Sequence, residues 1–158
     1  MSVLEFCRWV QFSPPLIALR GVWWFFPCIA TIHLLGLTVL GGAVLLVDLR
    51  LLGFGLRRQP AAQLARDVEP WLVGSLLVMV STGSLLFMCF ATKYYYLRFF
   101  WVKMAALFLV IVFTFSVRRH VAMADEAQVS KGWSRVVAVM SLSLWTTVAL
   151  GGRWIGFP

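Results

Sequence analysis

Long apolar segments, each bounded by short polar stretches, dominate the hydropathy pattern of the chain. The hydrocarbon core of a bilayer needs roughly 20 apolar residues per spanning helix. Four segments meet this requirement, and we expect spanning helices at residues 22–47, 71–91, 99–117 and 136–154. The predicted fold class is therefore all-α, an integral membrane four-helix bundle that forms a single domain over residues 1–158.

A shorter amphipathic pattern precedes the first apolar segment. Ser2 and Glu5 have the spacing of a capping box, which marks a helix start. Ser13-Pro14-Pro15 then interrupts the pattern. The apolar side chains that share one helical face are Val3, Phe6, Trp9 and Val10. We expect residues 2–12 to form an amphipathic helix that lies in the membrane interface.

The composition supports a membrane protein and excludes several other classes. Hydrophobic residues make up 61% of the chain and charged residues 13%, whereas soluble domains carry about 25% charged residues. A soluble enzyme domain, a disordered tail and a disulfide scaffold are thereby excluded. The formal net charge of +8 suggests anionic headgroups rather than nucleic acid, because so apolar a chain has little solvated surface. The lipid bilayer is the expected partner.

The distribution of Lys and Arg predicts an orientation in the membrane. Residues 48–70 and 118–135 carry eight of them, and the N-terminal segment, residues 92–98 and the C-terminus carry five. Because basic residues favour the cytoplasmic side, we expect both termini outside. In a bacterial inner membrane this side is the periplasm.

Two ionisable residues, His33 and Lys103, lie within the predicted spans. Charged groups are unfavourable in hydrocarbon, so such residues are candidates for function. From helix geometry, His33 is about 16 Å from the outer start of its span, near the midplane, and Lys103 is about 6 Å from the start of its own. We expect both to face a shared space in the outer half of the bundle.

The residues around His33 suggest room for a flat cofactor. Gly36 lies one turn further along the same helix, and Gly83 lies at similar depth in the second span. An imidazole is a haem ligand, and helical bundles often place such sites between inward-facing side chains. Basic residues at the outer edge that could neutralise haem propionates are Arg20, Lys93, Arg98 and Arg153. The expected cofactor is haem b or another tetrapyrrole, with His33 as the metal ligand.

Structural interpretations of the same residues remain open. His33 could simply form a hydrogen bond with a Ser or Thr of residues 81–84, and Lys103 could extend to the interface. Asp48 and Arg50 suggest a local ion pair or loop cap. His120 is expected at headgroup level, too far from His33 to share an iron with it.

Several short motifs resemble a known family. They are His33-Leu34-Leu35-Gly36, residues 48–53 (DLRLLG), residues 82–87 (TGSLLF) and Phe100-Trp101-Val102-Lys103. In this order they resemble an uncharacterised family of four-span bacterial inner-membrane proteins. At a greater distance the layout is similar to HemJ-type protoporphyrinogen oxidases and CopD membrane domains. The HemJ resemblance implies haem b and a functional pair formed by His33 and Lys103.

These observations lead to one main functional hypothesis and two others. The main hypothesis is a haem-binding protein with a redox or electron-transfer role, with Lys103 as second ligand, proton donor or propionate partner. If the protein is an enzyme, we expect an oxidoreductase with Lys103 as catalytic residue, acting on a tetrapyrrole or a quinone-type partner. A membrane or periplasmic redox partner and a homo-oligomer both fit this role. The alternatives are a non-catalytic assembly or anchoring subunit, suggested by the small residues at 41–42 and 81–84, and a copper-handling protein.

Overall fold

The protein is an elongated bundle of helices in the computed structural model, which describes residues 2–54, 59–124 and 129–155. No strand occurs among these residues. Three of the long helices are α3 (Phe25–Leu52), α4 (Ala61–Cys89) and α8 (Lys131–Trp154). The fourth is continuous and consists of α6 (Arg98–Phe113), η1 (Thr114–Arg118) and α7 (Arg119–Met123). These four are long and apolar enough to cross a membrane. The predicted helical membrane bundle is confirmed at this level.

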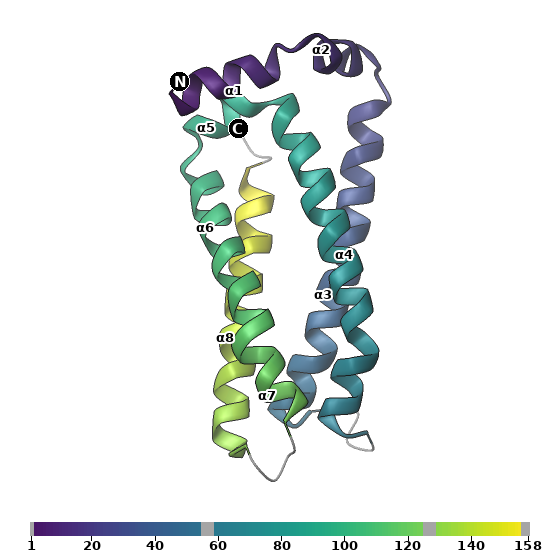
Figure 1. Ribbon diagram of the computed structural model, residues 1–158, viewed down its shortest axis with the longest axis vertical. Helices are drawn as coiled ribbons and strands as arrows, with labels where there is room; N and C mark the ends of the chain where they lie inside the picture. The colour runs from purple at the N-terminus through teal and green to yellow at the C-terminus, as the bar shows by residue number, and fades with distance from the viewer. Residues whose placement is uncertain (1, 55–58, 125–128, 156–158) are drawn as a thin grey trace.

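The four long helices pack mainly as two pairs. α3 packs on α4, α6 packs on α8, and a contact between α3 and α8 joins the pairs. Figure 1 shows the start of α3 and the end of α8 at the same end of the molecule, beside the N-terminal helices. We call this end the terminal end, and the other, where α3 leads to α4 and α7 to α8, the opposite end.

All four long helices are longer at the opposite end than the hydropathy pattern predicted. α3 continues to Leu52, and the third helix reaches Met123. α4 begins at Ala61 rather than at residue 71, with Pro70 inside it, and α8 begins at Lys131 rather than at residue 136. The first turns of α4 are amphipathic rather than uniformly apolar. Their buried residues, at helical spacing, are Ala61, Leu64, Ala65 and Val68. Polar residues between them hid this extension from a search for continuous apolar runs.

The main hydrophobic core occupies the opposite half of the bundle. It is formed by buried residues of α3, α4, α7 and α8, with Leu40, Val44 and Val137 among the largest fully buried side chains. A second, smaller cluster of Ala106, Val110 and Val148 joins α6 to α8. The helix pairs are thus held together most extensively far from the termini.

Two short helices cross the terminal end of the bundle (Figure 1). α1 (Val3–Gln11) begins with the predicted capping box, in which Glu5 N–H donates to Ser2 Oγ and Ser2 N–H donates to Glu5 Oε2. Trp9 is 68% exposed, whereas Val10 is buried with Leu16 and Cys89. The apolar face of α1 is thus divided: Val10 packs on the bundle, whereas Trp9 points outward.

The double proline starts a second helix that the sequence pattern did not predict. α2 (Pro14–Gly21) has prolines in its first turn, where their missing N–H groups are not needed. Arg20 then donates a hydrogen bond to the Cys89 carbonyl, and Gln11 accepts one from the Thr92 N–H. These contacts fasten α1 and α2 to the end of α4 and the start of α5 (Ala91–Tyr96).

Aromatic rings gather at the terminal end between α4 and α6. Phe87 and Phe100 stack with ring centroids 5.2 Å apart, and Tyr94 stacks on Phe100 at 5.8 Å. Burial raises the pKa of the Tyr94 hydroxyl above its ordinary value. Tyr94 is therefore neutral, and together with Phe87 and Phe100 it forms an apolar cluster at this end of the bundle.

Candidate cofactor site

His33 lies on α3 in the terminal half of the bundle, nearer the end than the sequence suggested. Because α3 begins at Phe25, the ring lies only about 12 Å along the helix axis from its start. Its Nδ1 atom is 2.8 Å from Thr82 Oγ1 on α4. This is the cross-helix bond to a threonine that the sequence offered as a structural interpretation.

The same bond determines which ring nitrogen of a neutral His33 carries the proton. Thr82 Oγ1 is 2.6 Å from the Val78 carbonyl oxygen, which can only accept, so the hydroxyl donates its single proton there. It is then left to accept from His33 Nδ1–H. The lone pair of the imidazole is consequently on Nε2, the arrangement found in metal-binding histidines whose other nitrogen is held by a neighbouring acceptor.

Gly83 packs directly against the His33 ring, as the sequence suggested. A Cβ atom on Gly83 would lie 3.3 Å from His33 Cε1. Gly36 has a different neighbour: a Cβ there would lie 3.2 Å from Val78 Cγ1 of α4. Of the two glycines, Gly83 gives space to the imidazole and Gly36 allows α3 and α4 to approach closely.

Lys103 lies in the interface between α6 and α8, in the same half of the molecule. Its side chain runs along two glycines of α8, since a Cβ on Gly151 would be 3.3 Å from Lys103 Cβ and one on Gly152 would be 3.3 Å from Nζ. The residue is half-buried. The two intramembrane ionisable residues therefore lie in the same half of the bundle, one in each helix pair.

Arg153 lies at the edge of this region rather than inside it. It is exposed in the last turn of α8, one residue after the glycines that contact Lys103. The position and the positive charge of Arg153 therefore suit a residue at the membrane surface. His120 is also exposed, in α7 towards the opposite end, and is separated from His33 along the bundle.

A second buried polar group, not predicted as a unit from the sequence, lies in the opposite half. Arg118 Nε donates to Asp48 Oδ1 at 2.6 Å, and both side chains are almost completely buried. A second guanidinium nitrogen donates to the Val44 carbonyl. Asp48 therefore pairs with Arg118, seventy residues away, rather than with nearby Arg50. Arg50 Nε donates to the Gln59 carbonyl instead.

The donor set of the described residues limits the metals that the protein could hold. Within residues 2–54, 59–124 and 129–155, no group of three or more His, Cys, Asp or Glu residues could enclose a metal ion. Cys7, Cys28 and Cys89 are all free thiols. A site that needs a single protein ligand, as haem does, can still be formed by His33.

Comparison with known proteins relates the chain to one family. No curated protein and no solved structure matches it, so these searches lend no support to a relationship with HemJ-type oxidases or CopD domains. Residues 18–158 match a family of unknown function, DUF6644, which covers the four long helices and Lys103 as well as His33. The chain therefore belongs to the DUF6644 family, whose function is not known.

Proposed function

We propose that this protein binds haem b, or a related tetrapyrrole, between the helix pairs in the terminal half of the bundle, and has a redox or electron-transfer role. The orientation of His33 carries the proposal. Thr82 accepts from Nδ1–H and thereby leaves Nε2 with a lone pair for iron. A purely structural His33–Thr82 bond would have the same tautomer, so the spectrum of His33→Ala distinguishes the two roles.

Lys103 and the glycines provide the remaining features of the proposed site. Gly83 keeps one edge of the imidazole free of a side chain, and Gly151 and Gly152 do the same along Lys103. The Lys103 amine suits a propionate carboxylate, a second ligand or a proton donor. Haem would supply one-electron redox chemistry, while these residues would bind it and set its electrostatic surroundings.

Optical spectroscopy of the purified protein tests this proposal directly. We expect a Soret band and, after dithionite reduction, an α band that disappears in His33→Ala and persists in His120→Ala. Absence of both bands from the wild-type protein, even after haem is supplied during expression, would refute haem binding. Loss of the bands in both variants would refute His33 as the specific ligand.

An assembly or anchoring subunit is the second candidate function. Gly41 and Gly42 have no heavy atom of the described structure within 4 Å of the position of an added Cβ, and Gly42 is exposed on α3. Such a surface allows another helix to approach closely in a membrane. A colourless wild-type protein that co-purifies with a partner in mild detergent, and loses it in Gly42→Leu, would favour this function.

The proposed setting is a bacterial inner membrane, with both termini in the periplasm. Copper handling ranks below the other two functions, because it needs more metal ligands than His33 alone. Stoichiometric copper in the purified protein, retained after dialysis, would reverse this order.

A further inference from the structure

The buried Asp48–Arg118 ion pair lies among several polar atoms that no described protein group satisfies. Four buried side-chain atoms find no hydrogen-bond partner among the described residues: Asp48 Oδ2, Thr114 Oγ1, Ser141 Oγ and Trp145 Nε1. Asp48, Thr114 and Ser141 are at most 2% exposed. A buried polar group without a partner costs about 1–3 kcal/mol, so these atoms are candidates for hydrogen bonds to bound water.

These atoms come from three segments that pack on one another. Thr114 and Arg118 belong to η1, Ser141 and Trp145 are one turn apart on α8, and Asp48 lies on α3. α8 packs against both η1 and α3. The Ser141 hydroxyl lies close to the Asp48 carboxylate but outside hydrogen-bond geometry.

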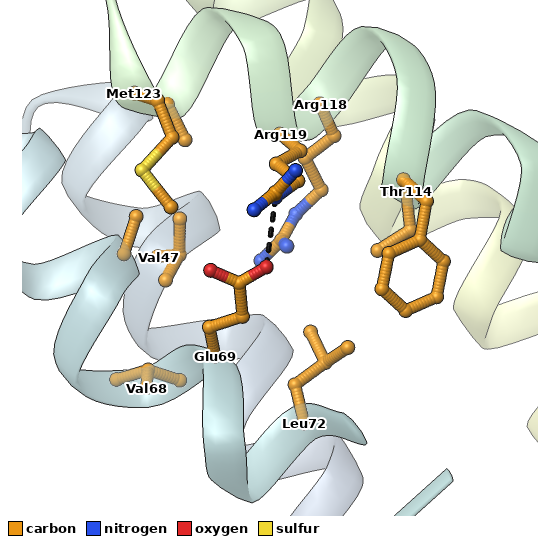
Figure 2. Close-up of a pocket in the computed structure, with 11 residues that line it drawn as sticks. Val47, Val68, Glu69, Leu72, Thr114, Arg118, Arg119 and Met123 are labelled. Atoms are coloured by element: carbon orange, nitrogen blue, oxygen red, sulfur yellow. Dashed lines mark ion pairs between the residues drawn. The ribbon is translucent and has the colours of Figure 1, made fainter.

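A small cavity in the opposite half of the bundle is lined by two residues of this group, Thr114 and Arg118. Its volume is about 30 Å³, and its walls include Thr114, Arg118 and Val47, the neighbour of Asp48. Figure 2 shows Glu69 of α4 and Arg119 of α7 facing each other across it, joined by an ion pair of 2.7 Å. Both are partly exposed, whereas Thr114 and Arg118 are buried.

The charges and the volume identify the ligand class. Asp48 would repel an anion and Arg118 would repel a cation, and the pair together has no net charge. The unsatisfied atoms include carboxylate and hydroxyl acceptors as well as an indole donor, which is the mixture that water can satisfy. A water needs about 10–15 Å³ of such a cavity and two to four polar partners.

We propose that the Asp48–Arg118 ion pair is hydrated by one or two bound waters, which enter through the cavity beside Glu69 and Arg119. The waters bond to Thr114 Oγ1 and the guanidinium and continue to Asp48 Oδ2 and Ser141 Oγ. This site is independent of the proposed haem site, which lies in the other half of the bundle.

Substitutions that remove one hydroxyl at a time test the proposal through the sign of their effect. If the hydroxyls bind water, Thr114→Val and Ser141→Ala break hydrogen bonds, and each raises the equilibrium constant for unfolding about fivefold. If the hydroxyls have no partner, removing them relieves unfavourable burial and stabilises the protein. Reversible unfolding in mixed micelles measures the difference.

Matched controls are available on α8. Thr147→Val and Ser143→Ala remove hydroxyls that are exposed and bond to carbonyls of their own helix. We expect these controls to change the unfolding constant less than twofold. Stabilisation by Thr114→Val or Ser141→Ala, or effects equal to those of the controls, would overturn the proposal.

An experimental structure that resolves ordered water provides a second test, which does not depend on variants. The expected result is density for water within hydrogen-bond distance of Thr114 Oγ1 and of Asp48 Oδ2. A direct Ser141–Asp48 hydrogen bond with no water beside Thr114 would overturn the proposal.

Discussion

A threonine one helix away determines the chemical state of the most interesting side chain in this protein. A neutral histidine side chain has two tautomers, and the environment selects one of them. Thr82 makes this selection because its proton is already committed to the Val78 carbonyl. His33 therefore presents Nε2 as an acceptor for as long as Thr82 is in place.

Thr82→Val is expected to weaken haem binding without abolishing it. The substitution keeps the shape of the side chain but removes the acceptor that orients His33, and loss of such a partner typically lowers metal affinity by about 10–100-fold. Titration of haem into the apoprotein, followed at the Soret band, measures the change. Thr147→Val is the control, and an affinity equal to that of wild type in Thr82→Val would contradict the role of Thr82.

Arg118→Met is expected to destabilise the protein strongly, because it leaves the Asp48 carboxylate buried without its cation. Breaking a buried pair in this way costs about 3–5 kcal/mol. The combined variant Asp48→Leu with Arg118→Met should recover much of this loss, since both charges are removed. Unfolding measurements on the two single variants and the double variant give the coupling between the residues.

The adjacent arginine serves as a matched control for this prediction. Arg119 forms its ion pair with Glu69 where both side chains are partly exposed. Such pairs contribute about 0–1 kcal/mol, so Arg119→Met should have a small effect. Equal losses for Arg118→Met and Arg119→Met would contradict the structural importance of the buried pair.

At the scale of the elements, the third long helix contains an irregular turn at η1. Residues 114–118 form a π-helical segment between α6 and α7, and both Thr114 and Arg118 in it are buried. Such segments accommodate an additional residue in an α-helix and often occur at functional positions. Here the segment presents Arg118 to Asp48 and Thr114 to the adjacent cavity.

Deleting Ser116 should be tolerated better than deleting Leu109. Both residues are exposed on the same helix. Removing one residue from a π-helical turn converts it to α-helix and leaves the flanking turns in register. Removing Leu109 instead rotates the following residues by about 100° relative to those before it, which takes Val110 out of the core. The yield of folded protein in size-exclusion chromatography compares the two variants, and equal yields would contradict this account.

At the scale of the whole molecule, the two halves of the bundle contain different groups of residues. The opposite half contains the main core and the Asp48–Arg118 pair, whereas the terminal half contains His33 and Lys103 on separate helix pairs. α1 and α2 cross the terminal end (Figure 1). The main core thus lies in one half of the bundle, and the two intramembrane ionisable residues lie in the other.

The orientation of the whole molecule in the membrane can be tested by cysteine labelling. In a variant without native cysteines, we expect Ser2→Cys and Lys93→Cys to react with a membrane-impermeant maleimide added to spheroplasts. Gln59→Cys and Ser130→Cys should react only after the membrane is opened, because their loops carry most of the basic residues. The reverse pattern would show that the termini are cytoplasmic.

Hydropathy alone was sufficient to establish the class of this protein and the approximate position of each span. Uniformly apolar segments have few alternatives to a helix in a bilayer, because their backbone groups must be satisfied within the segment. The capping box of α1 was equally predictable, since Ser2 and Glu5 act within one helical turn. The candidates His33, Gly83 and Lys103 were found because polar and very small residues stand out in apolar segments.

Pairings between residues far apart in the chain were decided by packing. Nothing near Asp48 in the sequence points to Arg118, and nothing near Lys103 points to Gly151 and Gly152. These partners depend on which helices are neighbours, on their relative rotation and on the irregular turn at η1. Hydropathy reports how each segment interacts with its solvent, whereas such contacts arise from the mutual fit of several helices, which only the three-dimensional arrangement specifies.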